Sequence, residues 1–187
     1  PELEDILRRI DRLSSPSTFD PMRSERAFRI ACTDYETTTL LLPLVQQLCD
    51  IAPGVRLHLI NGGDLGVNSV QDQTAEIALL SPDGEYPWAK HKMLLRENFM
   101  SLVPKTALPL TRKGYLELRH VVLATGEPEI NPVDALLDKD RRQIACRAQS
   151  FTTAIDIACA AHWAFNVPER LIRHVPLPEH MCLIKPV

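Results

Sequence analysis

Hydroxyl side chains recur in three short segments that follow expected strands and precede expected helices. These segments are 33–36, 81–83 and 150–153. A hydroxyl beside the free backbone N–H groups of a helix start can bind a carboxylate or another small anion. One exposed helix start contributes only about 0.3–1 kcal/mol, so two facing ends in a closed cleft would be needed for useful affinity. The alternative is that each hydroxyl only caps its own helix.

Carboxylates and histidines are spaced for structure rather than for catalysis. Asp34 and Glu36 form a carboxylate pair, but both fall where a helix start favours acidic residues. The sequence has no glycine-rich phosphate loop, no nucleophile elbow and no paired zinc-ligand motif. The nearest zinc candidates are His174, His180 and Cys182, and two prolines separate the histidines. We therefore expect no catalytic residue, no metal and no cofactor.

The five cysteines are odd in number and lie far apart among apolar neighbours. This pattern is typical of reduced core residues in a cytosolic protein rather than of a disulfide framework. A redox sensor that uses Cys146 and Cys159 is the alternative. Only Arg147, next to Cys146, could favour a thiolate there, so the sequence favours the core interpretation.

The composition excludes several classes of protein. The chain has 187 residues, of which 45% are hydrophobic and 24% charged, as in an ordinary globular domain. A net charge of −3 without a basic cluster leaves no footprint for nucleic-acid binding. The longest apolar runs, such as 40–44, are far shorter than the ~20 residues that cross a bilayer. Because the chain starts with Pro1 rather than methionine, we expect a fragment of a longer protein, and because its first segment is charged, we expect no signal peptide.

Alternating strand and helix patterns predict an α/β fold. In the first half, strands are expected at 26–32, 55–60 and 77–80, a helix at 39–49 and a polar segment at 67–74. In the second half, strands are expected at 99–103, 120–124, 143–148 and 181–184, and helices at 132–137, 150–163 and 169–173. The expected N-caps are Thr33 with Asp34, and Ser150 or Thr152. Strand–helix–strand order is typical of a parallel sheet, whose ligands bind beyond the carboxyl ends of the strands.

The first segment carries an apolar seam. Leu3, Ile6, Ile10 and Leu13 repeat at intervals of three and four residues, as in a coiled coil. A helix this short is marginal alone, so it must pack on something. It covers either its own domain or a second copy, as the tail of a longer dimerising helix.

Short motifs spread over residues 19–187 resemble the effector-binding domain of LysR-type transcriptional regulators. In chain order these motifs are Phe19-Asp20-Pro21, 24–31, Thr33-Asp34-Tyr35, Leu42-Pro43-Leu44, 52–55, 75–79, Ser150-Phe151, Ala160-Ala161 and 167–171. Each motif alone is weak, and the resemblance rests on their order and spacing.

The resemblance implies a type 2 periplasmic-binding-protein-like α/β fold, with two Rossmann-like lobes, a cleft between them and two crossover connections. Lobe I would comprise 15–106 and 165–187, and lobe II would comprise 107–164. The crossovers would lie near 104–109 and 164–167, and 1–14 would be the end of the linker helix that dimerises the protein. Relatives run on into a closing helix after the last strand, so part of lobe I would be missing from the chain.

The resemblance also implies a small-molecule effector, aromatic or anionic, in the cleft. The expected contacts are Thr33, Asp34, Tyr35 and Ser81 in lobe I, Thr125, Ser150, Phe151 and Thr152 in lobe II, and Phe165 and Asn166 at the return crossover. Asp34 departs from a simple anion site because its charge would repel a carboxylate. Either Asp34 caps its own helix and faces away, or the ligand brings a donor or a positive group.

The implied function is effector sensing and oligomerisation in a bacterial transcription factor. Such a factor would be a cytoplasmic homodimer or homotetramer with no membrane partner, and it would bind DNA only through a winged helix-turn-helix domain absent from this sequence. A solute-binding protein of the same fold that feeds a transporter is the alternative, which the reduced-cysteine pattern disfavours. An enzyme on this fold is a third possibility, but no nucleophile–base set supports it.

Overall fold

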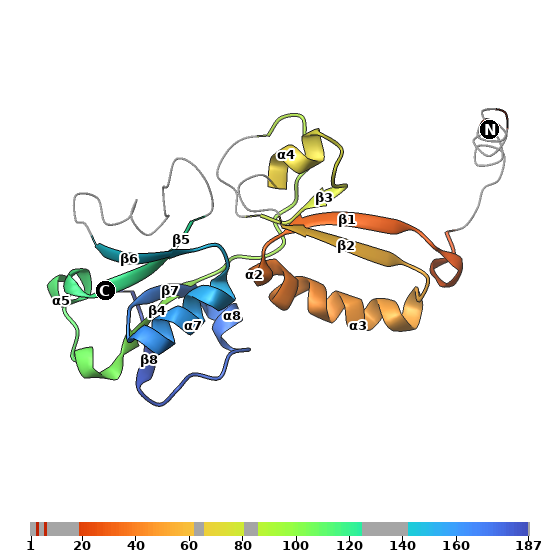
Figure 1. The fold of residues 1–187 in the computed structure, drawn as a ribbon. Coiled ribbons are helices and arrows are strands. Elements are labelled where there is room, and N and C mark those ends of the chain that lie inside the picture. Colours follow the sequence, from red (N-terminus) through yellow and green to blue (C-terminus); the bar gives the residue numbers. More distant parts are fainter. Residues whose placement is uncertain are drawn as a thin grey trace.

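The computed structural model describes residues 19–61, 66–80, 86–124 and 142–186, together with Leu3 and Ile6 (Figure 1). Leu3 and Ile6 are helical and exposed. The rest of the predicted seam, the predicted helix at 132–137 and the expected contacts Ser81 and Thr125 lie outside the described residues.

Three parallel strands form the sheet of the first lobe, in the order β2-β1-β3. The strands are β1 (Ala27–Cys32), β2 (Arg56–Asn61) and β3 (Ile77–Ala78). The register pairs Cys32 with Asn61, so the carboxyl ends of β1 and β2 lie side by side. This sheet confirms the parallel α/β unit that the sequence predicts for the first half.

Helices cover both faces of this sheet (Figure 1). After β1, the chain continues through α2 (Asp34–Glu36), a π-helical turn (Thr37–Leu41) and α3 (Leu42–Ile51). These elements lie on one face, where Leu41 of the π-helical turn packs with Ile30 and Cys32 of β1. On the other face lies α4 (Gly66–Gln71), close enough that a Cβ on Gly66 would lie 3.9 Å from the Cβ atoms of Ala31 and Ala78. A short 3-10 turn (Pro21–Arg23) precedes β1.

The second lobe contains the remaining strands. An antiparallel sheet has the order β7-β4-β8, formed by β4 (Phe99–Pro104), β7 (Phe165–Pro168) and β8 (Met181–Ile184). A parallel pair consists of β5 (Arg119–Leu123) and β6 (Gln143–Ala148). A parallel bridge between His120 and Ala164 joins β5 to the chain just before β7, so the two sheets adjoin.

Two apolar clusters hold the second lobe together. The larger cluster joins these strands to α7 (Phe151–Ala161) and α8 (Glu169–Ile172), and it includes Leu102 and Leu171. A 3-10 turn (Lys105–Ala107) and α5 (Arg112–Glu117) follow β4. The smaller cluster contains Val103 and Tyr115, so α5 packs against β4 on the side opposite to Leu102.

The strand pairing moves the expected boundary between the lobes. Residues 15–106 and 165–187 were assigned to lobe I, whereas β4, β7 and β8 pair with one another and share a core with α7. The expected crossovers near 104–109 and 164–167 are therefore wrong, because both segments lie within the second lobe. Apolar periodicity predicts that a segment is a strand but not which strand it pairs with, and here the partners of β4 are antiparallel.

Two elements of the second lobe were not predicted. No strand was expected between the helices at 150–163 and 169–173, but Val167 and Pro168 belong to β7, where Val167 pairs with Met100. The helix α5 was also missed, because Gly114 in its middle weakens the helical pattern. Within the described ranges, no helix has the length and apolar character needed to span a membrane.

Candidate functional site

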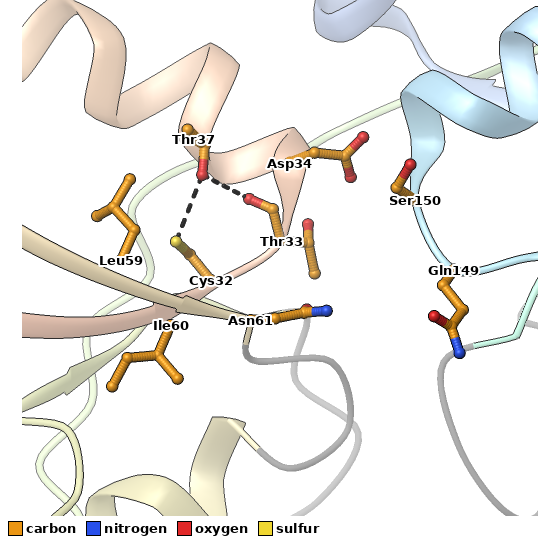
Figure 2. A pocket seen from close by; sticks show the side chains of 9 residues that line it. All are labelled: Cys32, Thr33, Asp34, Thr37, Leu59, Ile60, Asn61, Gln149 and Ser150. Atoms are coloured by element: carbon orange, nitrogen blue, oxygen red, sulfur yellow. Dashed lines mark hydrogen bonds between the residues drawn. The ribbon is translucent and has the colours of Figure 1, made fainter.

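A cavity of about 240 Å³ lies where the carboxyl ends of β1 and β2 face the loop between β6 and α7 (Figure 2). Its lining residues are Cys32, Thr33, Asp34, Thr37, Leu59, Ile60 and Asn61 of the first lobe, and Gln149 and Ser150 of the second. Of the expected effector contacts, Thr33, Asp34 and Ser150 line this cavity. Its position beyond the carboxyl ends of parallel strands is the one expected for this kind of sheet.

Thr33 begins α2, and its hydroxyl is already engaged. The Thr33 backbone N–H donates to Glu36 Oε2 at 2.8 Å, and the Thr33 hydroxyl donates to the same oxygen at 2.5 Å. The Tyr35 N–H donates to the Thr33 hydroxyl at 3.3 Å. These reciprocal bonds form a capping box. Capping of α2 therefore accounts for the presence of a hydroxyl residue at position 33.

Thr37 lies in the π-helical turn beside the cavity, and Cys32 ends β1. The Thr37 hydroxyl donates to the Thr33 carbonyl oxygen at 2.8 Å and lies 3.4 Å from the Cys32 sulfur (Figure 2). Burial raises the pKa of the Cys32 thiol, so at neutral pH the sulfur presents a neutral thiol to the cavity. Single π-helical turns within helices are often found at functional sites.

Asp34 reaches from the first lobe to the start of α7 in the second. Its Oδ1 accepts a hydrogen bond from the Phe151 N–H at 3.1 Å. Its Oδ2 accepts from the Thr152 N–H at 2.8 Å and from the Thr152 hydroxyl at 2.9 Å. A helix start carries partial positive charge, which favours a carboxylate there. The expectation that Asp34 caps its own helix is therefore wrong, because Thr33 does so and Asp34 caps α7.

Ser150 is the N-cap of α7, as predicted. Its hydroxyl oxygen accepts from the Thr153 N–H at 3.2 Å, and its carbonyl accepts from the Ala154 N–H at 3.0 Å. Together with the two amides bound by Asp34, every backbone N–H of the first turn of α7 has a protein acceptor. Thr152, also an expected contact, donates its hydroxyl hydrogen bond to Asp34 and does not line the cavity.

Tyr35 and Phe151 connect the lobes without lining the cavity. Although Tyr35 belongs to α2, it is only 8% exposed and lies in the core of the second lobe, with its ring centroid 5.9 Å from that of Phe151. Its hydroxyl donates to Glu97 Oε2 at 2.5 Å, and Arg170 Nε lies 3.6 Å from the same oxygen. Burial, and then the bond to the Glu97 carboxylate, raise the pKa of Tyr35.

Phe165 and Asn166 lie in the interior of the second lobe rather than at a crossover. Phe165 is 2% exposed and packs within the larger core. The Asn166 amide accepts a hydrogen bond from the Ser101 hydroxyl at 2.9 Å and donates to the Tyr115 hydroxyl at 2.7 Å. Neither side chain lines the cavity, because the antiparallel pairing of β7 with β4 buries both.

Two side chains of the lining that carry amide groups were not predicted from the sequence. Asn61 ends β2 and Gln149 follows β6, and Figure 2 shows their carboxamides on opposite sides of the cavity. Both positions follow from the rule on carboxyl ends of strands. The predicted contacts were hydroxyls at helix starts, whereas Gln149 lies one residue before Ser150 and Asn61 lies on the strand next to β1.

The metal and redox alternatives find no support in the geometry. Among the described residues, no group of three or more His, Cys, Asp and Glu side chains could hold a metal ion. His180 Nε2 lies 2.9 Å from the Cys159 carbonyl oxygen, and its ring stacks on His162. Burial, and then the charge of Asp156, raise the pKa of the Cys159 thiol, which is opposite to the shift that a reactive thiol needs.

Comparisons with known proteins agree with this geometry. Residues 23–184 match the family model described as the LysR substrate binding domain. The HTH-type transcriptional activator NagR of Ralstonia sp is 26% identical over 178 residues, which cover 89% of this chain and 58% of NagR. Nodulation protein D 1 of Rhizobium tropici is 26% identical over 164 residues, covering 83% and 53%. The chain therefore spans little more than half the length of these relatives.

Solved structures are similar in fold. A probable transcriptional regulator from Pseudomonas aeruginosa superposes with a TM-score of 0.78 at 26% identity, covering 96% of this chain and 63% of the other. The regulatory domain of MexT, a transcriptional activator of the same organism, superposes with a TM-score of 0.68 at 20% identity, covering 87% and 82%. At that lower identity the likeness shows the fold alone.

Proposed function

The chain belongs to the LysR substrate-binding domain family, and from that premise we propose that it senses a small-molecule effector in the cavity between its lobes. Effector binding would control DNA binding by a winged helix-turn-helix domain outside this sequence. The observation that carries the proposal is that both lobes line the cavity. A ligand there would touch the ends of β1 and β2 and the start of α7 together.

Sensing requires more than tight binding. A ligand shifts a conformational equilibrium only by its difference in affinity for the two states. A cavity with walls on both lobes supplies that difference, because any rotation of one lobe against the other changes the distance between Asn61 and Gln149. A bound molecule that bridges the two amides would therefore favour one orientation of the lobes.

The names of the relatives favour regulation over transport or catalysis. NagR is named a transcriptional activator and MexT is titled one, so the alternative of a solute-binding protein is not favoured. We propose a cytoplasmic factor that binds its effector without transforming it and reaches DNA only through its other domain. The exposed helical residues Leu3 and Ile6 support a homodimer or homotetramer built through the linker helix.

Thermal unfolding with a panel of aromatic acids, aromatic amides, amino acids and sugars tests this proposal. A ligand at 100 times its dissociation constant stabilises the folded state by roughly 2.7 kcal/mol. We expect at least one compound to raise the unfolding temperature of the wild type and of Gln143→Ala, a control at the far end of β6. The shift should be lost in Asn61→Ala. Silence across the panel, or equal shifts in all three proteins, would contradict effector sensing in this cavity.

A further inference from the structure

We propose that the cavity selects an uncharged ligand carrying hydroxyl or amide groups, and that Asp34 is the residue that excludes carboxylates. This inference deepens the proposed function and rests on it. Of the two alternatives that the sequence left open for the hydroxyl-bearing helix starts, it favours capping over an anion site.

The backbone N–H groups at the start of α7 could bind an anion, but the carboxylate of Asp34 already accepts hydrogen bonds from them. Asp34 accepts from the N–H groups of Phe151 and Thr152 at 3.1 Å and 2.8 Å, and the Thr153 N–H is bound to Ser150. A ligand carboxylate would find no free backbone donor in this turn. It could enter only by displacing Asp34, whose three hydrogen bonds join the lobes.

The other helix start at the cavity is closed in the same way. At α2 the Thr33 N–H and hydroxyl both donate to Glu36, a second carboxylate of the protein itself. Both helix starts therefore already have an anion beside them. A second negative charge at either place would be repelled by the carboxylate that is already there.

Charge in the lining points the same way. Among the nine residues that line the cavity in the described part of the chain, Asp34 carries the only ionised group, and none is lysine, arginine or histidine. Anionic ligands are commonly bound by cationic side chains or free helix starts. Here the described lining offers neither.

The lining instead offers neutral groups of both hydrogen-bonding senses. The carboxamides of Asn61 and Gln149 stand on opposite sides of the cavity (Figure 2). Each carries an acceptor oxygen and two donor hydrogens, and neither makes a hydrogen bond to the described residues. Leu59 and Ile60 add apolar surface on the first-lobe side of the lining (Figure 2). A molecule with hydroxyl or amide groups that reach both carboxamides, and with an apolar part that faces Leu59 and Ile60, matches this pattern.

The exclusion of carboxylates can be tested without knowing the effector. Sodium acetate and acetamide, at constant ionic strength, are titrated into the wild type, Asp34→Ala and Asp156→Ala, a control that removes an exposed carboxylate from α7 itself. Thermal unfolding and the amide NMR signals of Phe151 and Thr152 are followed. Acetate should raise the unfolding temperature and shift these two signals only in Asp34→Ala.

Two results would overturn the exclusion. One is acetate shifting the two amide signals as strongly in the wild type as in Asp34→Ala. The other is acetate leaving both proteins unchanged, which would mean that the helix start is not an anion position. If Asp34→Ala does not fold, Asp34→Asn, which keeps one acceptor oxygen, replaces it in the titration. The wild-type titration alone contradicts the proposal if acetate shifts the Phe151 and Thr152 amide signals.

The class of ligand is tested with matched pairs such as 4-hydroxybenzamide and 4-hydroxybenzoate. The amide member should bind the wild type at least tenfold more tightly than the acid. Asp34→Ala should lose that preference, whereas Gln149→Ala should weaken binding of the amide. A pair in which the acid binds better at these residues refutes the class. If no amide binds while acetate still binds only Asp34→Ala, the ligand class is refuted but the exclusion stands. Effector sensing itself fails separately, on the broader panel.

Discussion

The two helix starts at the cavity are closed by different means. At α2 the acceptor is Glu36, three residues along the chain from Thr33. At α7 the acceptor is Asp34, which precedes Phe151 by 117 residues and belongs to the other lobe. The first arrangement stabilises one helix wherever that helix lies, whereas the second exists only while the lobes hold their present orientation.

This difference separates a local cap from a contact between lobes. A cap within one segment contributes the same stability in every orientation of the lobes. Such a cap therefore cannot couple ligand binding to the orientation of the lobes. The bond from Asp34 to α7 depends on orientation and lies at the edge of the cavity. A ligand that strengthens or breaks it would therefore change how the lobes sit relative to each other.

The largest effect is expected for Asp34→Ala. Removing the carboxylate leaves two helix-start amides and one hydroxyl without their acceptor. Hydrogen bonds to charged groups contribute about 1.5–3 kcal/mol each, less what water replaces, so we expect a loss of about 2–3 kcal/mol in the free energy of unfolding. Urea denaturation measures this loss. Asp156→Ala, on the exposed side of α7, should change stability by less than about 0.5 kcal/mol. An equal loss in both variants would contradict a specific stabilising contact between Asp34 and α7.

Local features of this comparison could be predicted from the sequence. Thr33 and Ser150 were expected at helix starts because short hydroxyl side chains there satisfy free N–H groups nearby, and both are N-caps. Most strands of both halves also lie within two residues of the expected positions, because alternation of apolar residues depends only on neighbours in sequence. The capping roles follow from the same local chemistry.

Long-range features could not be predicted in this way. Nothing near Asp34 in the sequence indicates that its carboxylate oxygens accept hydrogen bonds from the start of a helix more than a hundred residues away. The same limit explains Asn166, which was expected at the cleft and instead bonds to Ser101 and Tyr115 inside the second lobe. Pairing of β7 with β4 places Asn166 opposite Ser101, and packing of α5 on β4 brings Tyr115 to the same place. Single-sequence periodicity specifies neither contact.

A smaller effect is expected for Ser150→Ala. This change removes the acceptor of the Thr153 N–H and the hydrogen bond that the Ser150 hydroxyl donates to the Thr153 hydroxyl, and it leaves the Asp34 bonds to α7 in place. Loss of an N-cap side chain costs about 1 kcal/mol, which equilibrium denaturation can measure. Ser150→Thr keeps a hydroxyl acceptor and should restore most of the stability. A loss as large as that of Asp34→Ala would mean that the local cap, and not the bond between lobes, dominates at α7.

Tyr35→Phe tests the other contact between the lobes through alkaline pH. The raised pKa of Tyr35 means that the folded protein holds the phenol proton more tightly than the unfolded chain. Wild-type stability should therefore fall as the pH rises above 10, by at most about 1.4 kcal/mol per pH unit. Tyr35→Phe should lose the bond to Glu97 at neutral pH, at a cost of about 1 kcal/mol, and should show a weaker alkaline decline. Parallel declines in both proteins would exclude Tyr35 as the cause.

The smallest effect is expected for Glu76→Gln, which breaks a contact confined to the first lobe. Glu76 accepts hydrogen bonds from the backbone N–H and the guanidinium of Arg29, and these bonds lower the pKa of its carboxyl to about 2. A carboxyl with a lower pKa in the folded state adds stability above its ordinary value near 4.5, and that stability disappears as the pH falls toward 2. Unfolding at several pH values should therefore show Glu76→Gln slightly less stable than the wild type at pH 7 and converging with it in acid. Because this pair bridges no lobes, the variant should keep the amide NMR signals of Phe151 and Thr152 unchanged, whereas Asp34→Ala should move both.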